Sequence, residues 1–513
     1  MTRGKEKPAA QSLSLAVSAL ALFKLAVHLG TSGVYGLFID ELYFLACGEH
    51  LDWGYVDAPP LTAVQAWLSR ALFGDSMLAI RLLPALAGAG LVLLTGVITR
   101  ELGGRRFAQF LAALAVVVAP VYLAFDSYLS MNSIEPLIWM GCVLVLMRMI
   151  RTGDTKLWIA FGVLAGIGLM NKHTMLMFGF AVILGLLLTR ERHLLRSPWL
   201  FVGGGIAFAI FLPNLIWNLR HHFPMLELLE NIRRDGRDIP FQPVSFLGLQ
   251  ILFQNPAALP LWVAGLWRLL ATPKGKPYRA LGIAYLVTLA ILLVRGKPYY
   301  LSSAYPILFA AGAVSIEEWL AIPGQRWLRA AYAVVLFLVG ALLAPTALPI
   351  LSPETYIRYT RFLHIEQPQL ENRAASALPQ FFADRFGWPE MVAIVARVYR
   401  SLSPEDQKRT AIFGNDYGQA GAIDFYGPRL GLPKAVGAHL TYWYWGPRGY
   451  TGESVLVLGG DREDLDAQFG SVRAVAEIGH PYAMRQEHFT LFLCREPKGW
   501  TLAELWPKLK RFD

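Results

Sequence analysis

Charged residues are scarce in this chain of 513 residues, at 16% of the total, against roughly 25% in soluble domains. The mean hydropathy is correspondingly high, at +0.41. Cysteine is scarce too: the three thiols are scattered and form no CxxC or zinc-type spacing, which excludes a disulfide framework. The basic residues occur in short clusters between apolar runs, which argues against nucleic-acid binding. These shortages predict a polytopic membrane protein.

Long apolar runs are, by contrast, frequent. About 11 of them are present, most near the roughly 20 residues that a bilayer-spanning helix needs. They lie near residues 13–33, 78–98, 107–125, 134–150, 157–170, 175–189, 198–217, 245–267, 280–294, 300–320 and 327–348. The first run follows a basic N-terminal segment and has no evident cleavage site, so we expect a retained signal-anchor helix.

The loops between these runs differ in charge, and this difference predicts the orientation. If the N-terminus is cytoplasmic, every inner loop is basic: they carry Arg3, Lys5, Lys7, Arg100, Arg105, Arg106, Arg148, Arg151, Lys156, Arg190, Arg192, Arg196, Arg268, Lys274, Lys276, Arg279, Arg326 and Arg329. The outer loops hold fewer bases, namely Arg70, Lys172, Arg220, Arg233, Arg234, Arg237, Arg295 and Lys297. We therefore expect a multi-pass protein with a cytoplasmic N-terminus and an extracytoplasmic C-terminal region.

Beyond about residue 348 the composition becomes that of a soluble domain. We expect a transmembrane domain over residues 1–348 and a small extracytoplasmic α/β domain over residues 349–513. Within the second domain, apolar spacing predicts a helix near residues 390–400. Short strand-like runs follow at residues 410–413, 454–458, 472–478 and 489–494.

Carboxylates gather between the first two apolar runs, where Arg70 is the one base. They are Asp40, Glu41, Glu49, Asp52, Asp57 and Asp75. Acids at the membrane edge are a functional-site hypothesis by default, because they are costly to keep beside lipid. The simpler alternative is that Asp40 caps a helix that starts at Glu41. Capping does not explain the four further acids, so we interpret Asp40 and Glu41 as catalytic candidates.

Asp57 precedes Pro59 and Pro60 in this same outer loop. The prolines end any helix, and we interpret them as a turn that returns an interfacial helix, near residues 61–73, to the membrane. Asp57 remains a candidate for binding substrate.

A second polar group is expected at the outer ends of later membrane helices. Glu135 opens the fourth apolar run, shortly after Asn132. A first-turn acid beside a proline is the structural alternative, but this placement puts both residues near the membrane depth of Asp40. Lys172 and His173 occupy the most polar break between two apolar helices, and His173 alone resembles a packed histidine more than a base.

Arg295, Lys297, Tyr299 and Tyr300 precede another apolar run. Interfacial Tyr and Lys often serve merely as anchors. The functional alternative is that these cations, together with Lys172, bind a lipid phosphate, because a phosphate leaving group needs its charge compensated.

Two stretches of the C-terminal region have compositions that bear on ligand binding. Residues 414–427 carry glycines at irregular spacing that does not fit GxGxxG, so nucleotide binding is not predicted. Residues 441–445, Thr-Tyr-Trp-Tyr-Trp, either pack in a core or stack on sugar rings or lipid. No metal-ligand set is predicted, since His221 and His222 lack partners; a second carboxylate at the outer site is able to orient the acceptor or hold a divalent cation.

Together these motifs resemble the family 39 glycosyltransferases of the GT-C class, a group that includes protein O-mannosyltransferases and is related to the aminoarabinose transferase that modifies lipid A. The resemblance covers about residues 13–345 and is most specific in FIDELYF, GYVDAPPL, SMNSIEPL, GLMNKH and GKPYYLSSAYP. The C-terminal region resembles the extra domain of bacterial members. The resemblance implies a GT-C helical bundle in a bacterial inner membrane.

The resemblance also implies a polyprenyl-monophosphate sugar donor, transfer on the outer face and inversion at the anomeric carbon. The family's Asp-Glu pair matches Asp40, as presumed base, and Glu41; its second acid matches Glu135. Ala58 is a departure, because the aminoarabinose transferases carry there a Lys that contacts phosphate. Lys172, Arg295 and Lys297 are then the candidate phosphate ligands.

We therefore predict an inverting hexosyl- or pentosyltransferase whose acceptor is an envelope lipid, glycan or protein. The alternative from a different class is a transporter or flippase of lipid-linked sugars, with the acids lining its pathway; no inverted repeat is found in the sequence to support it.

Overall fold

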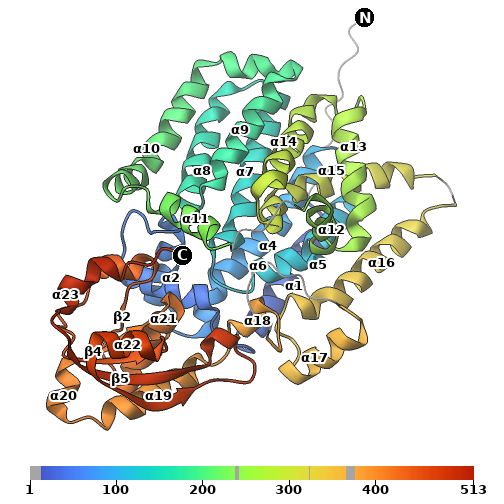
Figure 1. Cartoon of the computed structure of the whole chain (residues 1–513). Helices are drawn as coiled ribbons and strands as arrows, with labels where there is room; N and C mark the ends of the chain where they lie inside the picture. Colours follow the sequence, from blue (N-terminus) through green and yellow to red (C-terminus); the bar gives the residue numbers. More distant parts are fainter. Residues whose placement is uncertain (1–12, 237–241, 323, 366–375) are drawn as a thin grey trace, which may run out of the picture.

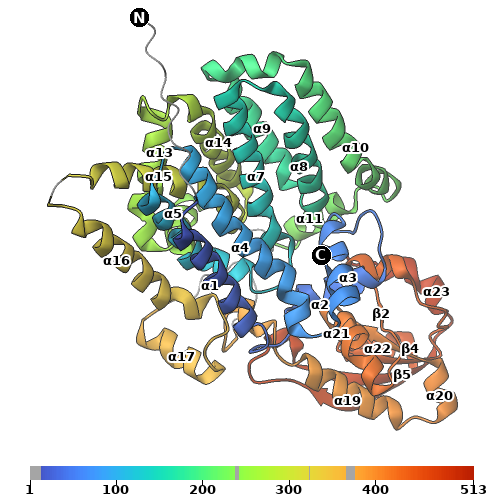
Figure 2. The same cartoon turned by 180° about the vertical axis from the view of Figure 1, so that it is seen from behind.

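The computed structural model describes residues 13–236, 242–322, 324–365 and 376–513, without the side chain of Arg295. Figure 1 and Figure 2 show a bundle of long helices with a small sheet domain at one end. The predicted class, a mainly helical polytopic protein with a C-terminal α/β domain, is confirmed.

The helices of the bundle follow the predicted apolar runs. They are α1 (Leu15–Thr31), α4 (Met77–Glu101), α5 (Arg106–Val118), α6 (Pro120–Phe125), α7 (Met131–Thr152), α8 (Trp158–Asn171), α9 (Thr174–Leu187), α10 (Pro198–Arg220), α12 (Pro243–Phe253), α13 (Leu259–Ala271), α14 (Arg279–Arg295), α15 (Tyr305–Trp319) and α16 (Trp327–Leu343). A 3₁₀ helix, η5 (Pro298–Ala304), leads into α15, and α11 (Pro224–Arg234) follows α10.

Not every apolar run is a straight span. Within the described residues, six helices are long and apolar enough to cross a membrane, or up to eight if each of two bent pairs is one span. The run near 107–125 breaks at Ala119, whose extended backbone precedes Pro120, because the residue before a proline disfavours the helical conformation. The run near 245–267 divides into α12 and α13, which meet at a bend of 94°.

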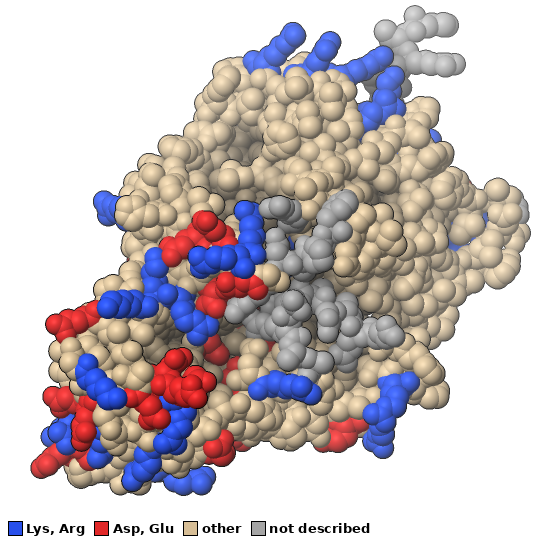
Figure 3. Space-filling model, in the orientation of Figure 1, with Lys and Arg blue, Asp and Glu red and all other residues tan. Residues whose placement is uncertain are grey.

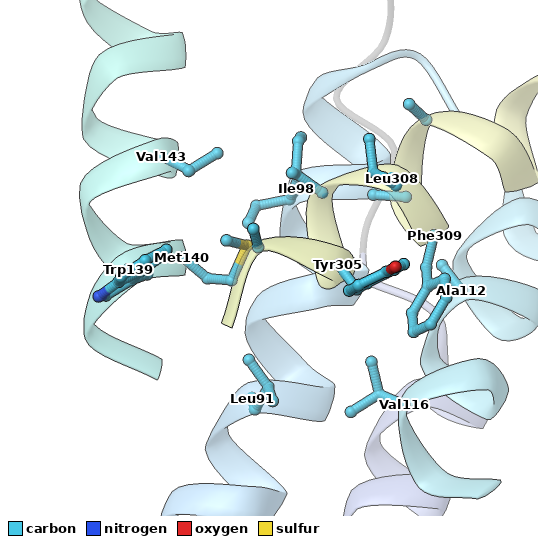
Figure 4. Close-up of a cluster of buried hydrophobic side chains, with 14 of the residues drawn as sticks. Leu91, Ile98, Ala112, Val116, Trp139, Met140, Val143, Tyr305, Leu308 and Phe309 are labelled. Carbon is cyan, nitrogen blue, oxygen red and sulfur yellow. The ribbon is translucent and has the colours of Figure 1, made fainter. Parts of the chain in front are cut away.

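The bundle core lies where α4, α5, α7 and α15 meet. Figure 4 shows Leu91, Val116, Trp139 and Phe309 among the side chains that fill this space, and all four are buried. Elsewhere glycines allow closer contact: Gly312 of α15 lies so near the Leu261 carbonyl of α13 that no Cβ fits between them. Small residues at such crossings are typical of membrane helices, whose association depends on packing.

The C-terminal domain begins after α16. Its helices are α17 (Pro353–Phe362), α18 (Gln380–Ala383), α19 (Trp388–Arg400), α20 (Pro404–Arg409), α21 (Tyr417–Tyr426), α22 (Arg462–Gln468) and α23 (Leu502–Leu505). Its strands are β1 (Thr410–Gly414), β2 (Val436–Gly437), β3 (Ser454–Leu458), β4 (Phe469–Ile478) and β5 (Phe489–Pro497). They form one sheet in the order β2-β1-β3-β5-β4, in which β1, β2 and β3 are parallel and β5 is antiparallel to both neighbours. The four predicted strands are confirmed, whereas β2 was not predicted.

Two helices of the first outer loop join this domain to the bundle. They are α2 (Ile39–Glu49) and α3 (Leu61–Phe73), and α3 matches the predicted interfacial helix. One hydrophobic core contains α2, the loop after it and the C-terminal domain. The contact between α2 and α21 is close, because a Cβ at Gly418 or Gly421 would meet Ile39 or Leu42. The predicted boundary at residue 348 lies before α17, but the hydrophobic core extends across it.

Charge is unevenly distributed on the surface in Figure 3. At the end of the bundle away from the C-terminal domain lysines and arginines are visible without acids, whereas on and beside that domain acids and bases are mixed. Between the two ends lies a broad belt of uncharged side chains. An uncharged belt between polar ends is the surface that a bilayer requires.

Candidate active site

The candidate site begins at the first turn of α2. Phe38 is the N-cap residue, and its N–H donates to Glu41 Oε2 over 2.9 Å. Asp40 is therefore not the cap, as the simpler alternative had it, but lies in the first turn. A carboxylate there is favoured by the helix dipole. The turn thus fixes two neighbouring acids in different directions.

Glu41 is buried and fully bonded. Arg81 of α4 donates Nε–H to Oε1 at 3.0 Å and Nη2–H to Oε2 at 2.6 Å, and the N–H groups of Phe38 and Leu129 supply two further bonds. Burial acts to raise the pKa of Glu41, but the Arg81 guanidinium outweighs it and holds that pKa below its ordinary value. Because four donors already occupy its oxygens, Glu41 is placed to brace α2 rather than to contact substrate.

Asp40, by contrast, is half-buried. The Tyr417 hydroxyl of α21 donates to Asp40 Oδ1 over 3.0 Å, so the C-terminal domain holds this carboxylate directly. Asp57 lies near it and accepts a hydrogen bond of 2.9 Å from the Tyr43 hydroxyl. Burial and the neighbouring Asp40 charge raise the pKa of Asp57 to about 6. The site therefore contains two interacting carboxylates, one of which titrates near neutrality.

A second residue of the C-terminal domain completes this group. Thr441, in the 3₁₀ helix η8 (Leu440–Trp445), is buried. Its hydroxyl is hydrogen-bonded to the hydroxyl of Tyr43 and accepts the N–H of Val56 over 3.1 Å. Tyr417 and Thr441 thus both act on the outer loop of the bundle. We call Asp40, Asp57, Tyr43, Tyr417 and Thr441 the outer cluster.

Several of the predicted residues meet in a second group, the membrane cluster, made of Asn132, Glu135, Lys172, Thr174 and Tyr300. Lys172 Nζ lies 3.2 Å from Glu135 Oε2 and 2.8 Å from Asn132 Oδ1. The Thr174 hydroxyl donates to the other oxygen of Glu135. Lys172 Nζ also lies 3.7 Å from the centre of the Tyr300 ring, a cation–π contact. Helices α7, α8 and α9 and the segment η5 all contribute.

Tyr128 lies between the two clusters. Burial and the charge of Asp40 raise the pKa of Tyr128, and the nearby Ser130 and Asn132 side chains act on that pKa in the opposite direction. Asn132 in turn binds Lys172. Tyr128 is therefore close to Asp40 on one side and to the membrane cluster on the other, so the predicted acids of α2 and α7 belong to one continuous site.

The remaining predicted residues lie at the margins of this site. His173 is hydrogen-bonded to Asn214 at 3.2 Å, which agrees with a packed histidine. Lys297 directly precedes η5, and the Tyr299 ring lies against the rings of Phe125 and Tyr300, with centroids 6.0 and 4.9 Å away. The side chain of Arg295 lies outside the described residues.

Four important residues were not predicted: Arg81, Arg385, Tyr417 and Thr441. Arg81 could have been identified from the sequence, because it is a charged residue within an apolar run. Arg385, from the C-terminal domain, is buried; it donates to the Ser127 hydroxyl over 3.2 Å and lies 4.6 Å from the Phe381 ring centre. Burial and the nearby Arg81 charge lower the pKa of Arg385 to about 9. Nothing in the sequence near residue 385 indicated this contact.

Metal ligands were also considered. In the part of the chain that the structure describes, no group of three or more His, Cys, Asp and Glu side chains is arranged to hold a metal ion.

This fold and this pair of clusters define a polytopic membrane protein with its polar site at one end of the bundle. Residues 57–217 match the family model described as dolichyl-phosphate-mannose-protein mannosyltransferase. That range contains Asp57, Asn132, Glu135 and Lys172 but begins after Asp40. No curated protein matches the sequence.

The whole fold is similar to that of ArnT from Cupriavidus metallidurans. Its structure bound to undecaprenyl phosphate matches with a TM-score of 0.61 and 15% identity, over 93% of this chain and 97% of that one. The apo structure matches with a TM-score of 0.60, again with 15% identity and the same coverage. The predicted resemblance is confirmed: the protein has a GT-C fold, and both the matching family and the neighbouring structures are of glycosyltransferases.

Proposed function

We propose that this protein transfers a sugar from a polyprenyl monophosphate to an acceptor hydroxyl or amine, with inversion, and that Asp40 is the catalytic base. The observation that carries the proposal is the position of Asp40, which is half-buried, hydrogen-bonded by Tyr417 and near Tyr128, a residue close to Asn132 of the membrane cluster. A carboxylate so placed is able to take a proton from a nucleophile while carbon–oxygen cleavage proceeds on the opposite face of the sugar.

The bonds that change are few. The acceptor oxygen or nitrogen forms a bond to the anomeric carbon, and the bond from that carbon to the phosphate oxygen breaks. The acceptor's proton passes to Asp40, and polyprenyl phosphate leaves with the bonding electrons. Asp57 carries a second negative charge near Asp40, which makes Asp40 a stronger base whenever Asp57 is ionised.

The leaving phosphate requires compensating charge. Lys172 is bound to Glu135 and Asn132, so we assign it first to shaping the donor side of the site. Lys297 precedes the same η5 segment that brings Tyr300 to Lys172. We propose that Lys297 and Arg295 bind the phosphate, with Lys172 adding to the positive potential.

Glu41 receives a different role from the one that the sequence suggested. Because Arg81 and two backbone N–H groups saturate it, we propose that it positions the first turn of α2 and hence Asp40. Glu135 similarly holds Lys172 and Thr174.

We propose that the reaction occurs on the outer face of a bacterial inner membrane. The basic predicted inner loops and the gathering of Lys and Arg at the end opposite the C-terminal domain support a cytoplasmic N-terminus, following the positive-inside rule. The acceptor is then an envelope lipid, glycan or protein that reaches the site from outside the cytoplasm.

The direct test uses purified protein in lipid nanodiscs and a panel of polyprenyl-phosphate hexoses and pentoses. Release of polyprenyl phosphate together with a glycosylated acceptor, both lost in Asp40→Asn, supports the proposal. Near-normal turnover in Asp40→Asn contradicts the assignment of the base. Movement of intact lipid-linked sugar across a vesicle membrane without phosphate release favours the transporter alternative.

A further inference from the structure

A cavity of about 330 Å³ lies beside the outer cluster, between the bundle and the C-terminal domain. Its lining includes His50, Asp52, Trp217, His221, Tyr444 and Trp445. This volume falls within the roughly 300–1,000 Å³ of small-molecule sites. No residue proposed above for the transfer chemistry lines it except Thr441, so its purpose is a separate question.

The cavity wall contains two tryptophan–histidine pairs, one within the bundle and one that joins the bundle's outer loop to the C-terminal domain. Trp217 of α10 stacks on His221, with ring centroids 4.1 Å apart and planes at 21°. Trp445 of η8 lies against His50 of the outer loop, at 4.4 Å and 30°. Tyr444 meets the edge of the His221 ring at 4.9 Å. Each pair holds its rings in a fixed orientation, so they offer a prepared apolar surface.

The aromatic run at residues 441–445 divides between the two roles that its sequence left open. Tyr442 is buried and donates to Asp424 over 3.0 Å, and Trp443 and Trp506 exchange hydrogen bonds from their indole N–H groups. These two side chains pack in the domain. Tyr444 and Trp445 instead line the cavity.

Polar groups accompany the rings. The Asp52 carboxylate accepts the indole N–H of Trp217 over 2.8 Å and the backbone N–H of Trp53 over 2.7 Å, and the residue is exposed. Burial, with the neighbouring Arg448 charge, lowers the pKa of His50, so its imidazole is neutral at neutral pH. With a carboxylate and a neutral imidazole in its lining, the cavity is poorly suited to an anion. Aromatic faces beside hydrogen-bonding groups fit a neutral ligand that has both C–H faces and hydroxyls.

Thr441 connects this cavity to the outer cluster. Thr441 lines the cavity, and its hydroxyl is hydrogen-bonded to Tyr43, which in turn donates to Asp57. A molecule seated against Thr441 is thus two hydrogen bonds from a carboxylate that interacts with Asp40.

From these observations we infer that the cavity is a saccharide-binding subsite that holds a neutral sugar ring of the acceptor between the Trp217–His221 pair and the Trp445–His50 pair. The identification of the bound saccharide as the acceptor rests on the proposed function, whereas saccharide binding itself does not require catalysis. The cavity is too small for a lipid tail of polyprenyl length, and its aromatic faces beside hydrogen-bonding groups fit the saccharide part of a glycan or glycolipid.

Binding is measured on the full-length protein in nanodiscs by saturation-transfer-difference NMR titration. The probes are free glucose, mannose, galactose and N-acetylglucosamine, and the disaccharides cellobiose and chitobiose. The test variants are Tyr444→Leu and Trp445→Leu, which keep apolar bulk but remove the aromatic faces. Phe362→Ala, at an exposed aromatic of α17, is the matched control, and Trp445→Phe tests rescue.

We expect at least one probe to bind the wild-type protein, with a tenfold or greater rise in Kd for each Leu variant and little change for Phe362→Ala or Trp445→Phe. The Leu variants should keep the affinity for polyprenyl phosphate, which shows that they are folded. Absence of binding for all six probes, or unchanged Kd values in both Leu variants, overturns the assignment.

A further arm separates this inference from the proposed reaction. Asp40→Asn should bind the same saccharide as the wild type does, since Asp40 does not line the cavity. If the wild-type protein binds saccharide there but never releases polyprenyl phosphate, the proposed reaction fails and the subsite stands. If transfer occurs normally and the Leu variants leave the acceptor KM unchanged, the subsite fails and the reaction stands.

Discussion

The outer cluster and the membrane cluster are built from contacts of different range. Asp40 and Tyr417 lie 377 positions apart in the chain, whereas Lys172 and Asn132 are separated by 40. The membrane cluster assembles as neighbouring helices pack, so its geometry belongs to the bundle. The outer cluster exists only once a separate domain has folded against α2. We therefore propose that the outer cluster, which combines residues of the bundle and of the C-terminal domain, carries the chemistry. The membrane cluster, which lies within the bundle alone, positions the donor.

The largest expected effect tests the outer cluster. Asp40→Asn keeps the size of the side chain and a hydrogen-bond acceptor for Tyr417 but removes the base. General base catalysis contributes typically 10²–10⁴-fold, so we expect transfer to fall by about a thousandfold, with the thermal unfolding temperature nearly unchanged. Polyprenyl phosphate release measures the first and a melting curve the second; a variant that merely unfolds would lose both together.

The next effect tests the membrane cluster. Lys172→Met leaves the Glu135 carboxylate buried without its cation, and removing one partner of a buried pair costs roughly 3–5 kcal/mol. Glu135→Gln leaves Lys172 unpaired, with a similar cost. The double variant Glu135→Gln/Lys172→Met should recover part of this loss. Denaturant unfolding in detergent measures all three, and strict additivity of the two single losses would contradict a direct pairing.

A smaller effect tests what the C-terminal domain contributes to the outer cluster. Tyr417→Phe removes one hydroxyl from the C-terminal domain and one hydrogen bond to Asp40. We expect kcat to fall about tenfold, which corresponds to ~1.4 kcal/mol, with the KM for the lipid donor unchanged. Tyr426→Phe, on the same helix, is the control. If Tyr417→Phe altered donor KM alone, its role would be in binding the lipid.

A pH-dependent effect on stability concerns the titration of Asp57. Its pKa is about 6 in the folded protein, against an ordinary value of 3.8, so the folded state retains this proton more tightly than the unfolded chain does. Stability from this group is therefore full below about pH 4 and is lost as pH rises through 6. Asp57→Asn cannot ionise, so its stability relative to the wild type should rise by roughly 2–3 kcal/mol between pH 4 and 7. Chemical unfolding at several pH values measures this; a pH-independent difference would contradict the raised pKa.

Much of the fold follows from local sequence. The apolar runs locate the helices of the bundle, and the four strand-like runs of the C-terminal region form four of the five strands. The break at Ala119 was missed although Pro120 signals it, because the apolar composition continues on both sides. The two-residue strand β2 is too short to produce an alternating pattern of its own.

The candidate site was predicted unevenly for a related reason. Asn132, Glu135, Lys172 and Tyr300 each stand at the outer end of an apolar run, and ends at one membrane level come together when the helices pack. The positions of Tyr417 and Thr441 cannot be predicted from membrane depth in this way, since their contact with α2 depends on how the C-terminal domain packs against the bundle. The glycines at positions 418 and 421 lie on one face of α21, and this spacing predicts close contact with another helix. Their irregular spacing within residues 414–427 bears on nucleotide binding but does not reveal this contact.

The contact between α21 and α2 has a consequence for chimeras. Because Gly418 and Gly421 leave no space at this seam, a foreign outer module grafted after residue 348 would meet a helix shaped for another surface. The transplantable piece must carry α2 and α3 with it, although they stand some 300 positions earlier in the chain. Recombination among such enzymes should therefore exchange the loop and the module as a pair.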